Sequence, residues 1–240
     1  MSRILVIPDS HLKPFMFDEA ERILAGGEAD FAVCLMDLVD NWGQQDNLEL
    51  YAEMFRVVMA FQKNHPGTLW CWGNHDLSYL WARRKSGIGS PVFRLVSVRL
   101  GELKDMIPEG NLVFLHRVDK LIFSHAGLTE DFVARFVPAG KQDSIDETIA
   151  AVNEFGPDEI WTEDSPVFAR PQFRKTAMFM GGQYVQVVGH TPGKEVFEDD
   201  GVISTDVYKT NSGGEPIGNR KMIIIDSETT EWHYSRIYDR

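Results

Sequence analysis

The chain has 240 residues, of which 43% are hydrophobic and 25% are charged, an ordinary composition for a globular protein large enough to bury a core. Its net charge of −12 at pH 7, from 36 acidic and 24 basic residues, argues against stable nucleic-acid binding because it repels polyanions at long range. An anionic substrate stays open, because bound metal ions reverse the local field.

The cysteines and the apolar runs indicate the cellular compartment. Cys34 and Cys71 each lie in an apolar run typical of a buried strand, which favours reduced thiols over a disulfide framework. The apolar run at residues 4–7 is far too short for a signal sequence or a membrane span. We therefore expect a soluble cytoplasmic protein with no membrane partner.

The first third of the chain alternates between strand and helix patterns. Continuous apolar runs predict buried strands at residues 4–7, 31–36 and 68–72. Apolar residues that recur every three or four positions predict helices at residues 15–24 and 46–63. This alternation indicates βαβ units and a mostly parallel sheet.

The rest of the chain is less regular. Helices are predicted at residues 91–103 and 145–155, and residues 112–115 are predicted to pair with residues 120–123 as strands. Further β-rich segments, separated by a loop at 211–219, lie at residues 184–188, 202–205, 221–225 and 231–237. No repeat or linker composition interrupts the sequence. We expect a single domain over residues 1–240, with an α/β fold: a four-layer α/β/β/α sandwich of two mixed sheets flanked by helices.

Polar side chains follow five of the predicted strands at the point where each strand ends. The five motifs are Asp9-Ser10-His11, Asp37-Leu38-Val39-Asp40, Gly73-Asn74-His75-Asp76, Ser124-His125-Ala126-Gly127 and Gly189-His190-Thr191-Pro192. In open α/β folds, ligands bind beyond the carboxyl ends of the strands, so these side chains are expected to meet at one rim. Carboxylate, amide and imidazole groups are ligands that suit Mn, Fe or Zn.

Each motif alone is weak evidence, because a histidine after a strand is more often structural than a metal ligand. The combination is far more specific, because four of the seven histidines directly follow apolar strands beside Asp, Asn or Gly. His65, His116 and His233 lack such surroundings, and we expect them to be structural.

In this order, the five motifs resemble those of the calcineurin-like metallophosphoesterase superfamily. The closer similarity is to its phosphoprotein phosphatase branch, which includes bacterial Ser/Thr protein phosphatases and symmetrical diadenosine tetraphosphate hydrolases. Residues 202–206 resemble the strand and the Asp that follow the last motif in that branch. Pro192 stands where many superfamily members carry a second His, which the branch also lacks.

The resemblance implies a site for two divalent or trivalent transition-metal ions (Mn, Fe or Zn) at the carboxyl ends of the strands. Asp9 and His11 would bind one ion, Asp37 would bridge both, and the second ion would be completed by Asn74, His125 and His190. A hydroxide between the ions would attack phosphorus in line. His75 would act as the general acid, and Asp40 would orient its imidazole. Asp76 is expected to fix the loop through a hydrogen bond.

The second motif departs from the family pattern at two positions. Met36 replaces a Gly before the bridging Asp, so a less strained backbone is expected there. Asn41 replaces the Arg that clamps the substrate phosphate, and an amide at this substrate-binding position cannot make bidentate charged contacts. Arg170 is our preferred compensating cation for the phosphate. The candidates considered are Lys13, Arg83, Arg84, Arg170 and Arg174.

Three functions fit these residues. The first is a phosphomonoesterase that resembles Ser/Thr protein phosphatases and acts on a phosphorylated substrate. The alternative is a nucleotide-directed hydrolase, either a dinucleoside polyphosphate hydrolase or a phosphodiesterase, which Asn41 and the nearby Trp42 and Trp81 keep open. The second alternative is an inactive metal-binding scaffold, which the presence of every proposed ligand and of His75 disfavours.

Overall fold

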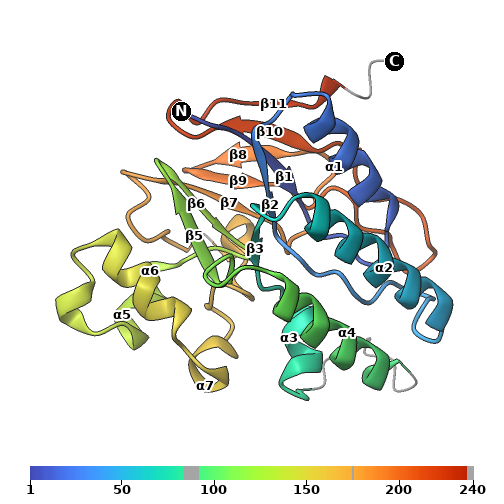
Figure 1. Ribbon diagram of the computed structural model, residues 1–240. Coiled ribbons are helices and arrows are strands. Elements are labelled where there is room, and N and C mark those ends of the chain that lie inside the picture. The colour runs from blue at the N-terminus through green and yellow to red at the C-terminus, as the bar shows by residue number, and fades with distance from the viewer. Residues whose placement is uncertain (84–91, 175, 237–240) are drawn as a thin grey trace.

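Two mixed β-sheets form the centre of the protein, whose structure is a computed structural model that describes residues 1–83, 92–174 and 176–236 (Figure 1). The sheets have the strand orders β11-β10-β1-β2-β3-β4 and β5-β6-β7-β9-β8. The strands of the first sheet are β1 (Arg3–Ile7), β2 (Phe31–Cys34), β3 (Leu69–Cys71), β4 (Leu112–Val113), β10 (Ile223–Asp226) and β11 (Trp232–Tyr234). The strands of the second are β5 (Leu115–Val118), β6 (Leu121–Ser124), β7 (Val185–Val188), β8 (Phe197–Asp199) and β9 (Val202–Ser204).

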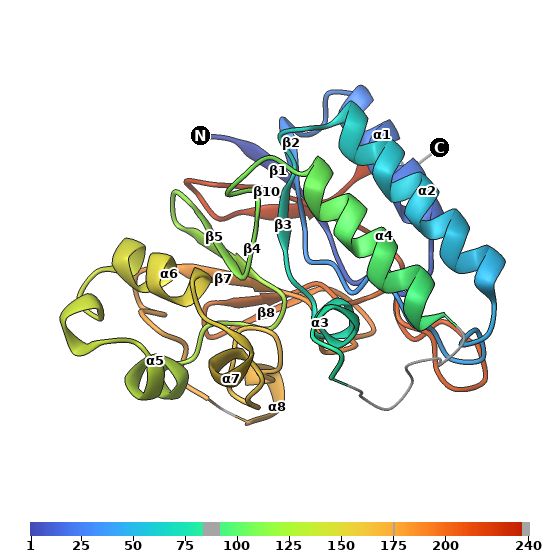
Figure 2. The same ribbon diagram turned by 60° about the horizontal axis from the view of Figure 1, so that its bottom comes forward.

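Helices flank both sheets. The helices α1 (Phe15–Ala25), α2 (Leu48–Asn64) and α4 (Phe93–Met106) lie beside one another on the first sheet (Figures 1 and 2). The elements on the side of the second sheet are α5 (Glu130–Phe136), η1 (Ala139–Lys141), α6 (Ile145–Asn153), α7 (Pro157–Ile160) and α8 (Pro171–Arg174). The expected α/β sandwich of two mixed sheets flanked by helices is confirmed. None of the described helices is long and apolar enough to cross a membrane.

Local sequence explains why the first strands and helices form. Residues 4–7 are fully buried, as expected for an interior strand that pairs antiparallel with β10 and parallel with β2. In α1 the buried residues fall on one face, and in α2 the side chain of Asn47 caps the helix by accepting from the backbone N–H of Leu50 at 3.1 Å. These elements begin and end within two residues of the predicted bounds.

The predicted pairing of residues 112–115 with residues 120–123 is wrong. β4 instead pairs in parallel with β3 of the first sheet, whereas β5 pairs with β6 in a hairpin of the second sheet. The chain crosses between the sheets at Phe114, where the backbone N–H groups of Phe114 and Leu115 both donate to Asn153 Oδ1. A contact this distant in sequence leaves no pattern in the apolar run itself.

Several short elements have no sequence prediction. They include α3 (Asn74–Leu80), α5, α7 and the edge strand β8. The predicted helix start at Pro91, the cation candidate Arg84 and the last predicted strand residue, Ile237, lie outside the described residues.

The register of the strands determines where the polar motifs meet. Ile7 of β1 pairs with Cys34 of β2, so the chain leaves both strands at the same level of the sheet. β3 runs parallel to β2, and β6 runs parallel to β7 in the second sheet. The segments that follow these five strands therefore come together at one end of the sandwich.

Candidate metal centre

The loops that follow β1 and β2 are held together by backbone hydrogen bonds. The N–H of His11 donates to the carbonyl of Asp37 at 2.8 Å, and the N–H of Leu12 donates to that of Leu38 at 3.0 Å. Asp9, His11 and Asp37 are at most 1% exposed. Two loops from neighbouring strands thus present their polar side chains as one rigid unit.

Two groups of potential metal ligands share one carboxylate. Asp9, His11 and Asp37 form the first group, and Asp37, His125 and His190 form the second, with the ligand atoms of each group within 4.8 Å of one another. Asn74 Oδ1 lies 3.0 Å from His125 Nε2, which places the amide beside the second group. All six residues expected as ligands are therefore brought together, with Asp37 between the two groups.

Backbone carbonyls orient two of the imidazoles. His11 Nδ1 donates to the carbonyl of Asp40 at 2.8 Å, and His125 Nδ1 donates to that of Leu35 at 2.8 Å. Because a backbone carbonyl engages Nδ1 in both rings, Nε2 is the atom that each ring offers to a metal ion. His190 differs, because its Nδ1 lies 3.1 Å from His125 Nε2 and its backbone N–H donates to Asp9 Oδ2.

The electrostatics of the centre favour bound cations. Burial raises the pKa of Asp9 well above its ordinary value, and burial together with Lys209 lowers the pKa of His11. Burial also opposes ionisation of Asp37, but the facing imidazoles of His125 and His75 outweigh it and lower the pKa of this carboxyl. Asp9 Oδ1 is buried and has no hydrogen-bond partner among the described residues. A buried carboxylate oxygen without a partner, set among imidazoles and carboxylates, fits a transition-metal ligand.

Two glycines allow the backbone to approach the carboxylates. A Cβ atom at Gly73 would collide with Asp37, and one at Gly189 would collide with Asp9. Any side chain at these positions displaces a carboxylate oxygen of the candidate centre. The glycines of the third and fifth motifs therefore have a steric role in shaping the site.

The backbone at the bridging position is strained, so the expectation that Met36 relaxes it is wrong. Met36 has a φ of 58° and Asp37 has a φ of 45°, in the left-handed region that residues other than glycine rarely adopt. The conformation aims the Asp37 carboxylate at both ligand groups, and the fully buried Met36 side chain packs in the core. Strain of this kind persists where the surrounding structure enforces it, often at functional sites.

His75 and Asp40 form a hydrogen-bonded pair at the edge of the centre. His75 Nδ1 lies 2.8 Å from Asp40 Oδ2, and the hydroxyls of Tyr51 and Tyr79 donate to Asp40 Oδ1 at 2.7 and 2.6 Å. The backbone N–H of His75 donates to Asp37 Oδ1 at 2.9 Å. Asp76 fixes the preceding loop as expected, because its Oδ1 accepts from the N–H of Leu38.

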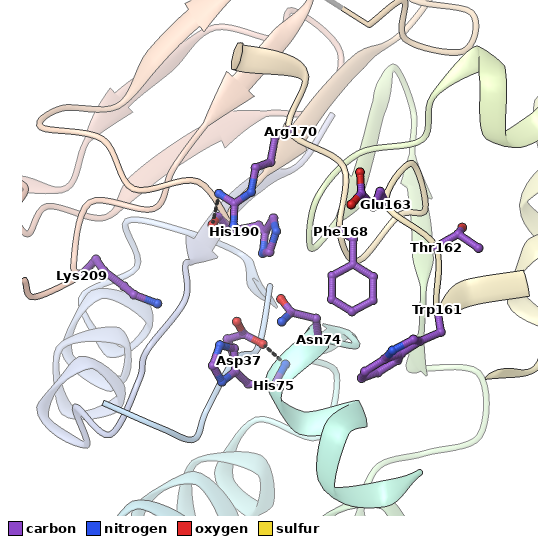
Figure 3. A pocket seen from close by; sticks show the side chains of 10 residues that line it. All are labelled: Asp37, Asn74, His75, Trp161, Thr162, Glu163, Phe168, Arg170, His190 and Lys209. Atoms are coloured by element: carbon purple, nitrogen blue, oxygen red, sulfur yellow. Dashed lines mark hydrogen bonds between the residues drawn. The ribbon is translucent and has the colours of Figure 1, made fainter. Parts of the chain in front are cut away.

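A pocket of about 430 Å³ opens over the two ligand groups (Figure 3). Arg170 and Lys209 supply its positive charge, while Trp161 and Phe168 supply an aromatic wall. The residues that line the pocket are Asp37, Asn74, His75, Trp161, Thr162, Glu163, Phe168, Arg170, His190 and Lys209. Sequence reasoning did not single out Lys209, because it stands in a loop without a motif.

The remaining cation candidates lie differently. Lys13 is buried, and its ammonium donates to the backbone carbonyls of Ser10 and His11. Arg83 pairs with Asp158 at 2.9 Å. The side chain of Arg174 lies outside the described residues. Of the cations named from sequence, Arg170 is therefore the one that the described structure places in the pocket.

Asn41 and the two tryptophans named from sequence lie outside the pocket lining. Asn41 Oδ1 accepts a hydrogen bond from Thr210 Oγ1 at 2.6 Å. Trp42 is 51% exposed, and the ring of Trp81 packs edge-on against that of Trp161. The aromatic surface on the pocket is thus that of Trp161 and Phe168, and Trp81 packs against the Trp161 ring.

The two buried His/Asp groups share one carboxylate at the strand ends of a two-sheet sandwich, and this arrangement is typical of metal-dependent hydrolases that use two ions. The protein belongs to the calcineurin-like phosphoesterase family, whose family model matches residues 2–210. Members of this family typically bind two metal ions, and the chain is a metal-dependent phosphoesterase.

A solved structure shows the same fold. The chain resembles the cold-active protein-tyrosine phosphatase of a psychrophilic Shewanella species, with 14% identity, a TM-score of 0.55, and coverage of 98% of this chain and 80% of that one. An archaeal phosphodiesterase aligns with 15% identity and a TM-score of 0.44, over 97% of this chain and 98% of that one. None of the curated proteins matches the sequence. At 14% identity, the likeness to the Shewanella enzyme shows the fold and not the substrate.

Proposed function

We propose that the protein is a phosphomonoesterase of the phosphoprotein phosphatase type, with two Mn, Fe or Zn ions. Asp9 and His11 would hold one ion, Asn74, His125 and His190 would hold the second, and Asp37 would be shared between them. Bound there, the ions supply Lewis-acid activation of water and of the phosphoryl group. The observation that carries the proposal is that His75 and Arg170 line one pocket directly over the shared Asp37.

The chain's own residues then divide the remaining work. Arg170 presents its guanidinium to the pocket, where it neutralises non-bridging phosphate oxygens. His75, held at Nδ1 by Asp40, keeps Nε2 for the proton that the leaving oxygen needs. A monoester dianion carries one more charge than a diester, and a pocket with both Arg170 and Lys209 favours the greater charge.

One observation favours the nucleotide-directed alternative. Trp161 and Phe168 form an aromatic wall on the pocket, and the guanidinium of Arg83 lies 5.7 Å from the centroid of the Trp161 ring. A ring supported in this way offers a stacking surface for a nucleobase. The aromatic wall can stack on any aromatic leaving group, including that of a monoester. It therefore favours substrates with aromatic leaving groups and does not distinguish a monoester from a diester.

A substrate panel with added Mn²⁺ tests the proposal. We expect p-nitrophenyl phosphate and a phosphopeptide to be hydrolysed with a higher kcat/KM than bis(p-nitrophenyl) phosphate or a dinucleoside polyphosphate. A preference for the bis ester or the dinucleotide would replace the proposal with the alternative. If none of these substrates is hydrolysed, the result would instead support the inactive metal-binding scaffold.

The Arg170→Ala variant tests the phosphate contact. We expect a KM for the monoester at least about tenfold higher, since a charge-assisted contact contributes about 1.5–3 kcal/mol. Arg56→Ala, which removes an exposed arginine from α2, is the matched control and should leave KM unchanged. An unchanged KM and kcat for Arg170→Ala would remove Arg170 from the substrate site.

A further inference from the structure

A hydrogen bond joins the loop after β9 to the position where the family's phosphate-clamping Arg is missing. Thr210 Oγ1 donates to Asn41 Oδ1 at 2.6 Å, although the two residues are 169 positions apart in sequence. Both partners are neutral, so the bond contributes no charge to a phosphate. Its effect is to fix the backbone of the β9 loop beside the second motif, and the residue before Thr210 is Lys209.

Lys209 brings a positive charge from this loop into the pocket. Its side chain is half-buried, lines the pocket with His75 and Arg170, and approaches from a different side than Trp161 (Figure 3). Its Nζ lies 2.6 Å from His11 Nε2. The ammonium therefore reaches the edge of the candidate metal centre itself.

The contact with His11 cannot persist when that imidazole binds a metal ion. His11 Nδ1 donates to the carbonyl of Asp40, so Nε2 has a single lone pair that serves either Lys209 or a metal. Next to bound cations an ammonium is electrostatically unfavourable unless an anion lies between them. The flexible four-carbon stem of lysine allows the ammonium to follow such an anion.

From these contacts we propose that Lys209 binds the phosphate of the substrate and takes over the task of the Arg that Asn41 replaces. This inference rests on the proposed function of the site as a phosphoester hydrolase centre. Lys209 and Arg170 then supply two cations to one phosphate, from different segments of the chain. Asp206, buried three residues before Lys209, attracts the ammonium through space.

Binding of inorganic phosphate to the Mn²⁺-loaded protein tests the proposal without reference to turnover. The variants are Lys209→Met, which removes the charge at similar size, and Lys209→Arg, which keeps it. Lys104→Met is the matched control, because Lys104 is an exposed lysine on α4. Bound Mn²⁺ per chain is measured for each variant beside the phosphate affinity.

We expect Lys209→Met to retain two Mn²⁺ ions and to bind inorganic phosphate about tenfold more weakly, as loss of one charge-assisted contact implies. Lys209→Arg should bind phosphate with near wild-type affinity, and so should Lys104→Met. In turnover, Lys209→Met should raise KM for p-nitrophenyl phosphate more than for the singly charged bis ester.

Three results would overturn the proposal. Unchanged phosphate affinity in Mn²⁺-loaded Lys209→Met would show that Lys209 does not contact the anion. Tighter Mn²⁺ binding with unchanged phosphate affinity would make Lys209 only a competitor for the metal site. Loss of Mn²⁺ would make it a support for the metal ligands. Because phosphate binding is measured directly, a wild-type protein that binds phosphate but hydrolyses no ester would contradict the proposed function and not the role of Lys209.

Discussion

The imidazole of His75 is held by the carboxylate of Asp40, with 2.8 Å between His75 Nδ1 and Asp40 Oδ2. The bond commits Nδ1 to Asp40 and leaves Nε2 to exchange a proton at the pocket, which His75 lines. The ring is also fixed from its backbone, whose N–H donates to Asp37 Oδ1. His75 therefore links Asp40, which fixes the position of the proton on its ring, to Asp37 of the candidate metal centre.

Replacing His75 by Asn should lower kcat by about 10²–10⁴ for alkyl phosphates, whose leaving oxygens need a proton. The loss should be smaller for p-nitrophenyl phosphate, because its leaving group departs as a stable anion. Bound Mn²⁺ should stay the same, since the bond to Asp37 comes from the backbone. His65→Asn, at a histidine that pairs with Glu21, is the control. Equal losses for both leaving groups would contradict an acid role.

Tyr51 and Tyr79 determine which oxygen of Asp40 faces His75. Their hydroxyls both donate to Asp40 Oδ1, and burial together with this carboxylate raises the pKa of each phenol, so both remain donors. Changing either to Phe should cost about 1 kcal/mol of unfolding free energy and lower kcat several-fold.

The double variant measures whether the two tyrosines act together on Asp40. Because they share one acceptor oxygen, we expect their effects on kcat to be non-additive. Tyr234→Phe is the control, since its hydroxyl accepts from Asn219 on another part of the fold. A double variant with unchanged kcat would show that the orientation of Asp40 does not depend on these hydroxyls.

Sequence alone predicted which residues gather at the candidate metal centre, because continuous apolar runs mark buried strands and the polar motifs follow directly at their ends. It failed where distant contacts decide the structure. Asn153 Oδ1 accepts hydrogen bonds from the backbone N–H groups of Phe114 and Leu115, where the chain passes from one sheet to the other. The apolar pattern of residues 112–118 gives no sign of this contact.

The errors within the site have a similar origin. At Met36, the absence of glycine suggested a relaxed backbone, yet hydrogen bonds between the β1 and β2 loops hold a positive φ there. Lys209 lies in an irregular loop without a sequence motif. The tertiary contact of its neighbour Thr210 with Asn41 places this loop beside the second motif. Residue types at strand ends, and Arg170 among the pocket cations, are thus predictable from sequence, whereas the pocket cation Lys209 is not.

Gly189→Ala should weaken Mn²⁺ binding by at least about tenfold, because the added Cβ would collide with the Asp9 carboxylate. Gly101→Ala is the matched control, since its Cβ meets nothing within 4 Å in the middle of α4. That control should stabilise the protein by about 0.5–1 kcal/mol through helix propensity. Titration calorimetry with Mn²⁺ and thermal unfolding check both variants. Wild-type Mn²⁺ affinity in Gly189→Ala would contradict the steric argument.

Asp206 gives the metal-free protein a defined dependence of stability on pH. Burial raises the pKa of this carboxyl to about 6, with Lys209 acting in the opposite direction, and neither of its oxygens has a hydrogen-bond partner in the described part of the chain. Between pH 4 and pH 6 the unfolded chain has lost the proton that the folded chain keeps. The unfolding free energy contributed by Asp206 therefore falls as pH rises, by on the order of 3 kcal/mol.

Asp206→Asn removes this titration while preserving the shape of the side chain. Groups distant from Asp206 titrate equally in both proteins, so the difference in unfolding free energy between variant and wild type reports Asp206 together with the charged groups that face it, Asp9 and Lys13 among them. We expect the variant to gain stability relative to wild type between pH 4 and pH 6.5, and the difference to level off above. Urea unfolding with a chelator at each pH gives the difference, and Asp143→Asn, at an exposed position, should show none. A difference that stays constant with pH would mean that Asp206 is already ionised in the folded protein near pH 4, with its charge balanced by the neighbouring lysines.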